Sequence, residues 1–171
     1  MTRSATPSLP FVVPPGGGLD APLSRLGTIH KVPGGITGGQ LAIVEHTLPP
    51  RALAAPVHRH SREDELSIVL TGRIGALLGD DVVEGGAGAY VWKPRNQWHT
   101  FWNASDTEEL RFIELILPGG FEGYFERLSP MLRAAGGAKP EAIQSLAEEY
   151  GIEFDFASIP RVCERFGLTF A

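Results

Sequence analysis

The chain has 171 residues, the length of one ordinary domain with enough residues to bury a hydrophobic core. Hydrophobic residues make up 43% of it and charged residues 20%, which is typical of a globular protein, and no apolar run approaches the ~20 residues that span a bilayer. The net charge is −5 and no cluster of lysine or arginine stands out, which argues against a nucleic acid as partner. We expect neither a membrane protein nor a nucleic-acid-binding protein.

The N-terminal segment, residues 1–20, combines prolines with the run Gly16-Gly17-Gly18 and has no hydrophobic periodicity. We predict an arm that is flexible or draped over the body of the protein. The segment also lacks the apolar stretch of a secretion signal, and the single cysteine, Cys163, excludes an intrachain disulfide. A cytoplasmic location is therefore the expectation.

The middle of the chain, from Thr28 to Leu117, repeats short apolar runs that are bounded by Gly, Pro, Asn or Asp. This pattern predicts a mainly β, antiparallel fold that closes as a sandwich or small barrel. The tripeptide Gly79-Asp80-Asp81 is typical of a hairpin turn. The predicted strands are Gln40–Leu48, Leu66–Thr71, Arg73–Leu78, Ala89–Lys93, Trp98–Trp102 and Glu109–Leu117.

The C-terminal part of the chain has a different periodicity. Apolar residues recur at helical spacing from Phe121 to Leu132 and again after Pro140, which predicts two helices. Within residues 152–171 we expect an extended stretch and a last short helix that begins at Pro160.

Three of the five histidines lie in two short segments of the β region. His58 and His60 are two residues apart, so an extended strand would place both imidazoles on the same face. Glu65 follows five residues later and can join them if the chain bends, and His99 lies in the aromatic strand Trp98–Trp102. Three neutral imidazoles and one carboxylate suit one divalent transition metal, whether iron, manganese, nickel, copper or zinc, with positions left open for water or a substrate.

The spacing of these residues resembles the two signature motifs of the cupin superfamily. Every motif position matches except Asn96, which stands where the family usually has glycine. Asparagine tolerates the left-handed backbone conformation that such a turn needs, so we expect the turn to form. The motif positions are His58, His60, Glu65, Gly72, Gly88, Pro94, Asn96, His99 and Asn103.

This resemblance implies a double-stranded β-helix, the jelly-roll barrel of cupins, with C-terminal helices as in the small bacterial cupins named for quercetin dioxygenase. The organisation we expect is the arm over residues 1–20, the barrel over 21–120, and a helical segment over 121–171 packed on the barrel. By the same resemblance Glu65 is the candidate catalytic residue, which would leave the metal and accept a proton. The implied metal ligands are His58, His60, Glu65 and His99.

Two further carboxylates compete with Glu65 for the metal. Only Glu65 keeps both its interval from His60 and its interval to the motif glycine. We therefore expect Glu63 and Asp64 to be surface charges or partners of neighbouring arginines, which are Arg59 and Arg62.

All three tryptophans, at positions 92, 98 and 102, fall within eleven residues of one another. They can close the barrel or a subunit interface by packing, or they can form the wall of a cavity for a flat or apolar substrate. Strand alternation places Trp98 and Trp102 away from the face of His99 and places Phe101 on that face. The candidate pocket residues are Phe101, Tyr90 and Trp92.

Three other polar residues lie in or beside the predicted strands. Glu114 interrupts an apolar strand, so it is either paired with a base such as Arg73 or Arg111 or retained for function, and we expect pairing. His46 is expected to be structural or exposed. Asn103 is expected to form a turn or to hydrogen-bond behind the site.

The sequence leaves several functions open. The first hypothesis is a metal-dependent, oxygenase-type enzyme, similar to cupin dioxygenases, that acts on a small organic molecule; an isomerase or lyase that uses no oxidant fits the same ligands. The second is a cupin that binds or senses a small molecule without changing it, and a metal-free structural role is the third. Because related cupins commonly pair through exposed strands, and pairing protects a sheet edge, we expect a homodimer.

Overall fold

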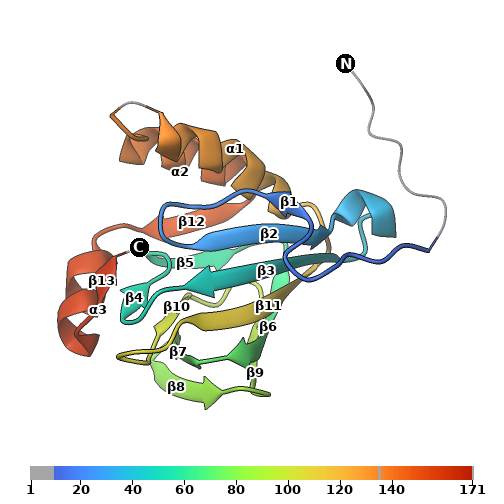
Figure 1. Cartoon of the computed structure of the whole chain (residues 1–171). Helices are drawn as coiled ribbons and strands as arrows, with labels where there is room; N and C mark the ends of the chain where they lie inside the picture. Colours follow the sequence, from blue (N-terminus) through green and yellow to red (C-terminus); the bar gives the residue numbers. More distant parts are fainter. Residues whose placement is uncertain (1–9, 135, 171) are drawn as a thin grey trace.

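The computed structural model describes residues 10–134 and 136–170 of the chain (Figure 1). The strands are β1 (Leu19–Asp20), β2 (Gly27–Val32), β3 (Ala42–Leu48), β4 (Ala52–Leu53), β5 (Val57–His60), β6 (Asp64–Thr71), β7 (Arg73–Leu78), β8 (Asp81–Gly86), β9 (Tyr90–Lys93), β10 (His99–Asn103), β11 (Leu110–Leu117), β12 (Ile152–Asp155) and β13 (Thr169–Phe170). The helices are the 3-10 helix η1 (Gly34–Thr37) and the α-helices α1 (Glu122–Arg133), α2 (Pro140–Glu149) and α3 (Ser158–Phe166).

Two sheets form the body of the protein. The first has six strands in the order β1-β2-β3-β11-β6-β9, and the second follows the order β12-β5-β10-β4-β13, with β7 paired to β10 and β8 paired to β7. All pairs are antiparallel except β4 with β13. Apolar side chains of both sheets pack together in the interior, as those of a closed sandwich do. The predicted mainly β fold with C-terminal helices is confirmed.

The six predicted strands are all present, with bounds that differ by no more than two residues. The predicted hairpin turn is also present, since Leu78 pairs with Asp81 and Gly79 takes a positive φ of 61°. Strand β8 was not predicted because most of its residues are exposed, so it carries no alternation of apolar and polar side chains.

The predicted helices α1 and α2 lie together at one end of the body, beside β2 and β12, and far from the β7–β8 hairpin (Figure 1). Their apolar faces pack against the sheet in one buried cluster. Glu122 fixes the start of α1, because its carboxylate oxygens accept hydrogen bonds from the backbone N–H of Gly34 at 2.7 Å and of Gly120 at 2.6 Å. Within the described residues, no helix is long and apolar enough to cross a membrane.

The two ends of the described chain both contribute strands. The end of the predicted arm is β1, in which Leu19 pairs with His30 of β2, while residues 1–9 of that arm lie outside the described part. At the other end, α3 packs on the outside of the second sheet, where Phe166 stacks on Trp102 with ring centroids 4.4 Å apart. The guanidinium of Arg51 donates hydrogen bonds to the carbonyl oxygens of Phe166 and Gly167 and so caps this helix.

Candidate metal centre

Strand pairing brings together the two histidine segments of the sequence. His99 of β10 lies opposite His58 of β5 in the antiparallel pair. Along β5 the burial alternates, so His58 and His60 both point inward while Arg59 between them points outward, as the spacing predicts. Glu65 follows the turn after β5 and lies near the start of β6.

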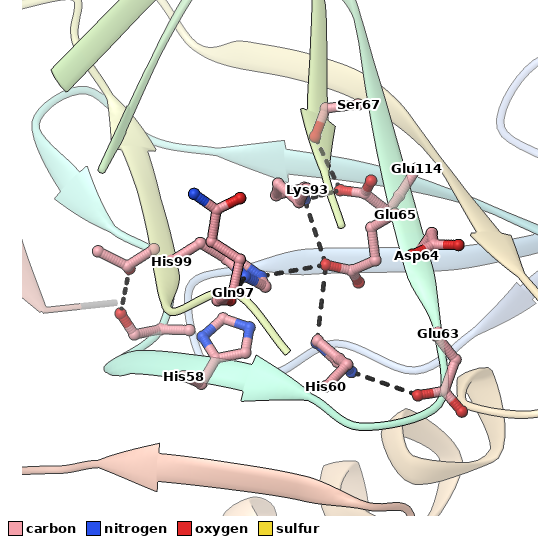
Figure 2. Close-up of polar contacts among 12 residues, drawn as sticks. His58, His60, Glu63, Asp64, Glu65, Ser67, Lys93, Gln97, His99 and Glu114 are labelled. Atoms are coloured by element: carbon pink, nitrogen blue, oxygen red, sulfur yellow. Dashed lines mark hydrogen bonds and ion pairs between the residues drawn. The ribbon is translucent and has the colours of Figure 1, made fainter. Parts of the chain in front are cut away.

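The four side chains converge on one point of the interior (Figure 2). One ligand atom from each of them lies within 4.8 Å of every other. The carboxylate Oε2 of Glu65 is 3.6 Å from Nε2 of His60 and 3.3 Å from Nε2 of His99. All four residues are at most 6% exposed. The residues are His58, His60, Glu65 and His99.

Backbone carbonyls orient two of the imidazoles. Nδ1 of His58 lies 2.8 Å from the carbonyl oxygen of Pro56, and Nδ1 of His99 lies 3.0 Å from that of Gln97. A carbonyl oxygen only accepts, so each Nδ1 carries the hydrogen and each Nε2 keeps its lone pair free. Second partners of this kind hold the ligands of metal sites in a fixed tautomer.

The third imidazole faces a carboxylate without a hydrogen bond to it, since Nδ1 of His60 is 3.6 Å from Oε2 of Glu63. At the centre of the cluster, Nε2 of His60, Nε2 of His99 and Oε2 of Glu65 are buried and have no hydrogen-bond partner among the described residues. Buried polar atoms without partners are costly unless a ligand meets them. The donor set therefore fits a divalent transition metal, which these four residues can hold.

The charge states also suit a cation. Burial lowers the pKa of His58 well below 6.5 and that of His99 below the same value, so both rings are neutral, the form that binds metal. Burial opposes ionisation of Glu65, but the ammonium of Lys93 and the imidazoles of His60 and His99 outweigh it, and its pKa lies well below the usual value.

A buried lysine stands behind the site, which the sequence analysis missed. Nζ of Lys93 is 2.6 Å from Oε2 of Glu114 and 3.4 Å from Oε2 of Glu65, and the hydroxyl of Ser67 donates to Glu114 at 2.9 Å (Figure 2). Burial and the negative charge of Glu65 raise the pKa of Glu114 to about 7, although Lys93 opposes the shift. The two carboxylates raise the pKa of Lys93 against the effect of its burial.

The expected partner of Glu114 is therefore corrected. Neither Arg73 nor Arg111 reaches it; Arg111 donates to Glu45 at 2.7 Å and Arg73 lies 3.4 Å from the exposed Glu84. Both arginines point outward from their strands, whereas Glu114 points inward. The alternation of β9 places Lys93 on the same face as the buried Val91, but the sequence alone does not say which face of this strand points inward.

The expectation for the two other carboxylates is also corrected in part. Glu63 is only 6% exposed and faces His60, so it is not a surface charge. Asp64 does pair with an arginine, but the arginine is Arg95, at 2.6 Å, and Arg59 pairs with Glu153 instead. Arg95 and Glu153 each lie in a segment distant in sequence from the residue with which they pair.

A cavity opens beside the four ligands. Its water-accessible volume is about 170 Å³. His58, His60 and Glu65 line one part of it, and Phe101 lines it from the second sheet. Most of the remaining wall is apolar, and α1, α2 and β12 contribute part of it, so the C-terminal helices cover one side of the site. The residues of α1 and of the position just before it are Phe121, Tyr124, Phe125, Leu128 and Leu132.

The other two expected pocket residues lie elsewhere. Tyr90 is 68% exposed and Trp92 is 50% exposed, and neither lines the cavity. Strand β9 alternates, with Val91 and Lys93 inward, so Tyr90 and Trp92 face the outside. The sequence did not fix this direction, because large side chains occupy both faces of the strand.

His46 is buried rather than exposed, with 2% of its surface accessible, and it lines the cavity. Asn103 forms the turn expected of it: its amide nitrogen donates to the carbonyl oxygens of Leu48 and Glu108, and its amide oxygen accepts from the N–H of Ser105. Asn96 adopts the left-handed conformation with φ 66°, as the sequence predicts.

Comparison with known proteins agrees with this geometry. Residues 44–116 match the Cupin domain family, Cupin_2, a segment that contains all four candidate ligands. The predicted resemblance to cupins is confirmed over this segment. No curated protein matches the sequence.

Solved structures with the same fold share little sequence with this chain. KdgF from Halomonas sp. is 17% identical with a TM-score of 0.52, and the match covers 59% of this chain and 86% of KdgF. A predicted oxalate decarboxylase from Thermotoga maritima is 19% identical with a TM-score of 0.51, covering 54% and 80%. A cupin 2 domain-containing protein from Halorhodospira halophila is 18% identical with a TM-score of 0.51, covering 56% and 66%. At these identities the likeness is one of fold.

Proposed function

We propose that this protein is a metal-dependent enzyme of the oxygenase type that acts on a small, largely apolar organic molecule. The observation that carries the proposal is the convergence of four buried donor atoms at the wall of an apolar cavity. The ligands in this proposal are His58, His60, Glu65 and His99. A bound divalent transition metal would supply open positions for substrate oxygen atoms and, if redox-active, for dioxygen.

The chain itself supplies orientation and exclusion of water. The carbonyls of Pro56 and Gln97 hold two imidazoles in the tautomer that binds metal. Helices α1 and α2 cover one side of the cavity, which favours an apolar substrate and keeps bulk water from the reacting atoms. In a dioxygenase reaction both oxygen atoms enter the product, so no separate reductant is needed.

Glu65 is the proposed proton acceptor of the site. Its Oε2 is the atom that faces His60 and His99, and Lys93 holds the same atom at 3.4 Å on the other side. If a metal is bound, Lys93 would still pair with this carboxylate, and Glu65 would be the group placed to accept a proton from the substrate.

The same site supports a second candidate, an isomerase or lyase that uses no oxidant. The buried Lys93 and Glu114 favour it, because they place two further acid–base groups beside the ligands. Both candidates differ from a binding or sensing cupin, which would leave its ligand unchanged.

An oxygen electrode and mass spectrometry of the products separate these functions. Protein reconstituted in turn with Fe(II), Mn(II), Ni(II), Cu(II) and Zn(II) is screened against aromatic hydroxyketones and diketones. We expect oxygen uptake with at least one redox metal, its loss in His99→Ala, and its retention in Arg59→Gln, whose side chain lies outside the site. Conversion without oxygen uptake would favour the isomerase or lyase, and tight binding without conversion would favour the sensor.

A further inference from the structure

One ring nitrogen of His46 is hydrogen-bonded within the protein. Its Nδ1 lies 3.2 Å from the carbonyl oxygen of Gly27 and 3.1 Å from the hydroxyl oxygen of Thr28. The Gly27 carbonyl only accepts, and the Thr28 hydroxyl is itself placed to donate to the carbonyl of Leu26 at 3.5 Å. Nδ1 therefore carries the hydrogen, and Nε2 keeps a lone pair.

The other ring nitrogen of His46, Nε2, faces a different environment. Nε2 makes no hydrogen bond to any residue in the described part of the chain, while the ring lines the cavity. Burial lowers the pKa of His46 to about 4, so the ring is neutral near pH 7 and Nε2 is an acceptor. An acceptor in an apolar cavity costs stability unless a donor from a bound molecule meets it.

Aromatic rings connect His46 to the candidate metal centre. The ring centroid of His60 is 4.6 Å from that of Phe121, which is 4.8 Å from that of Phe125, which in turn is 5.6 Å from that of His46. Phe121 immediately precedes α1, Phe125 lies within it, and both line the cavity. The wall between the two polar ends is therefore continuous and aromatic.

The charged residues of the cavity wall restrict the chemical class of ligand that fits. The carboxylates of Glu65 and Glu114 line the cavity, and no lysine or arginine is among the described residues that do, so nothing there would neutralise an anionic group of a ligand. A ligand with a flat apolar ring system would pack against the aromatic wall. One uncharged hydrogen-bond donor on that ligand would meet Nε2 of His46.

We propose that His46 is a specificity-determining residue: its Nε2 accepts a hydrogen bond from a hydroxyl or N–H group at the end of the substrate away from the metal. The substrate is then an aromatic or similarly flat molecule with a donor at one end and oxygen ligands at the other. This inference rests on the proposed function, because it takes the four-residue cluster as the second anchor of the same molecule.

The test uses two probes of nearly equal shape, 2-naphthol and naphthalene, which differ by one hydroxyl. Binding is measured by calorimetry for zinc-loaded and for metal-free protein. We expect the wild type to bind 2-naphthol about fivefold to tenfold more tightly than naphthalene, the range that one net hydrogen bond gives. His46→Leu should reduce this ratio to near one, and His46→Gln, whose amide oxygen also accepts, should restore part of it.

Nitrogen-15 labelling of histidine gives a readout in the unmutated protein. We expect 2-naphthol, but not naphthalene, to shift the Nε2 resonance of His46, and we expect His46→Leu to retain bound zinc. Equal binding of the two probes by the wild type, binding of neither, or a preference that persists in His46→Leu and vanishes in His99→Ala would overturn the inference. Absence of bound metal would instead refute the proposed function, and the metal-free measurement would still test His46.

Discussion

His99 lies directly opposite His58 across the antiparallel pair of β5 and β10, although the two residues are far apart in the sequence. This pairing places two imidazoles side by side, with ring centroids 4.3 Å apart. The strand register therefore builds the site, and substitutions that disturb the interior of the barrel should affect the site as well.

The first prediction concerns the buried charge behind the ligands. Lys93→Met removes the only ammonium that contacts Glu65 and Glu114 within the described structure, so two buried carboxylates lose their partner. We expect the free energy of unfolding to fall by about 3–5 kcal/mol, the usual cost of breaking a buried pair. Urea denaturation of metal-free protein measures this loss.

Two further variants show whether the loss of stability in Lys93→Met comes from the buried unpaired charges. The double variant Lys93→Met/Glu114→Gln should recover part of the lost stability, because it removes one of the two unpaired charges. Asp64→Asn breaks a pair with Arg95 at the surface and should change the unfolding midpoint little. A single Lys93→Met variant as stable as the wild type would contradict this reading of the buried network.

The second prediction concerns the contact between β7 and β10. Gly75 pairs with Trp102, and a Cβ at Gly75 would collide with the indole ring, which Phe166 of α3 covers on its other side. We expect Gly75→Ala to lower the free energy of unfolding by about 1–3 kcal/mol through overpacking. Gly86→Ala in the neighbouring β8 is the control, since its Cβ would meet no atom within 4 Å. Equal effects of the two substitutions would argue against the packing described for Trp102.

The third prediction is a pH dependence that arises from His46. Burial lowers the pKa of its ring in the folded protein to about 4, from 6.5 for an exposed histidine, with a smaller contribution from Lys93. Between these two values the unfolded chain binds more protons than the folded one, so stability falls as the pH decreases. We expect the free energy of unfolding to decrease by about 3 kcal/mol more in the wild type than in His46→Gln between pH 7 and pH 4.

Metal-free protein in chelator is used for this comparison, because the candidate ligands also titrate. Urea denaturation at a series of pH values gives both curves, and the difference between them isolates His46. Parallel curves for the wild type and His46→Gln would show that the ring is not held neutral by burial.

The spacing of the cupin motifs predicted much of the site. The interval from His58 to Glu65 and the position of His99 were enough to select the four side chains that the structure brings together. The turn at Asn96 was predictable for a local reason, because a single backbone conformation satisfies that position and asparagine tolerates it.

The surroundings of the site depend on contacts that spacing does not encode. Lys93 is buried because Glu114 and Glu65 reach it from two other strands, and the sequence does not pair those strands. Tyr90 and Trp92 looked like pocket residues because their size suits a pocket, but β9 is an edge strand and its outer face lies in solvent. The homodimer and the cytoplasmic location stay predictions.

The most direct test of the central claim is elemental analysis of tag-free protein purified without chelators. We expect about one equivalent of a divalent transition metal in the wild type and in Arg59→Gln, and none in the double variant His58→Ala/His99→Ala. The same metal content in the double variant, or no metal in the wild type even after reconstitution, would contradict the assignment of these four residues as a metal site.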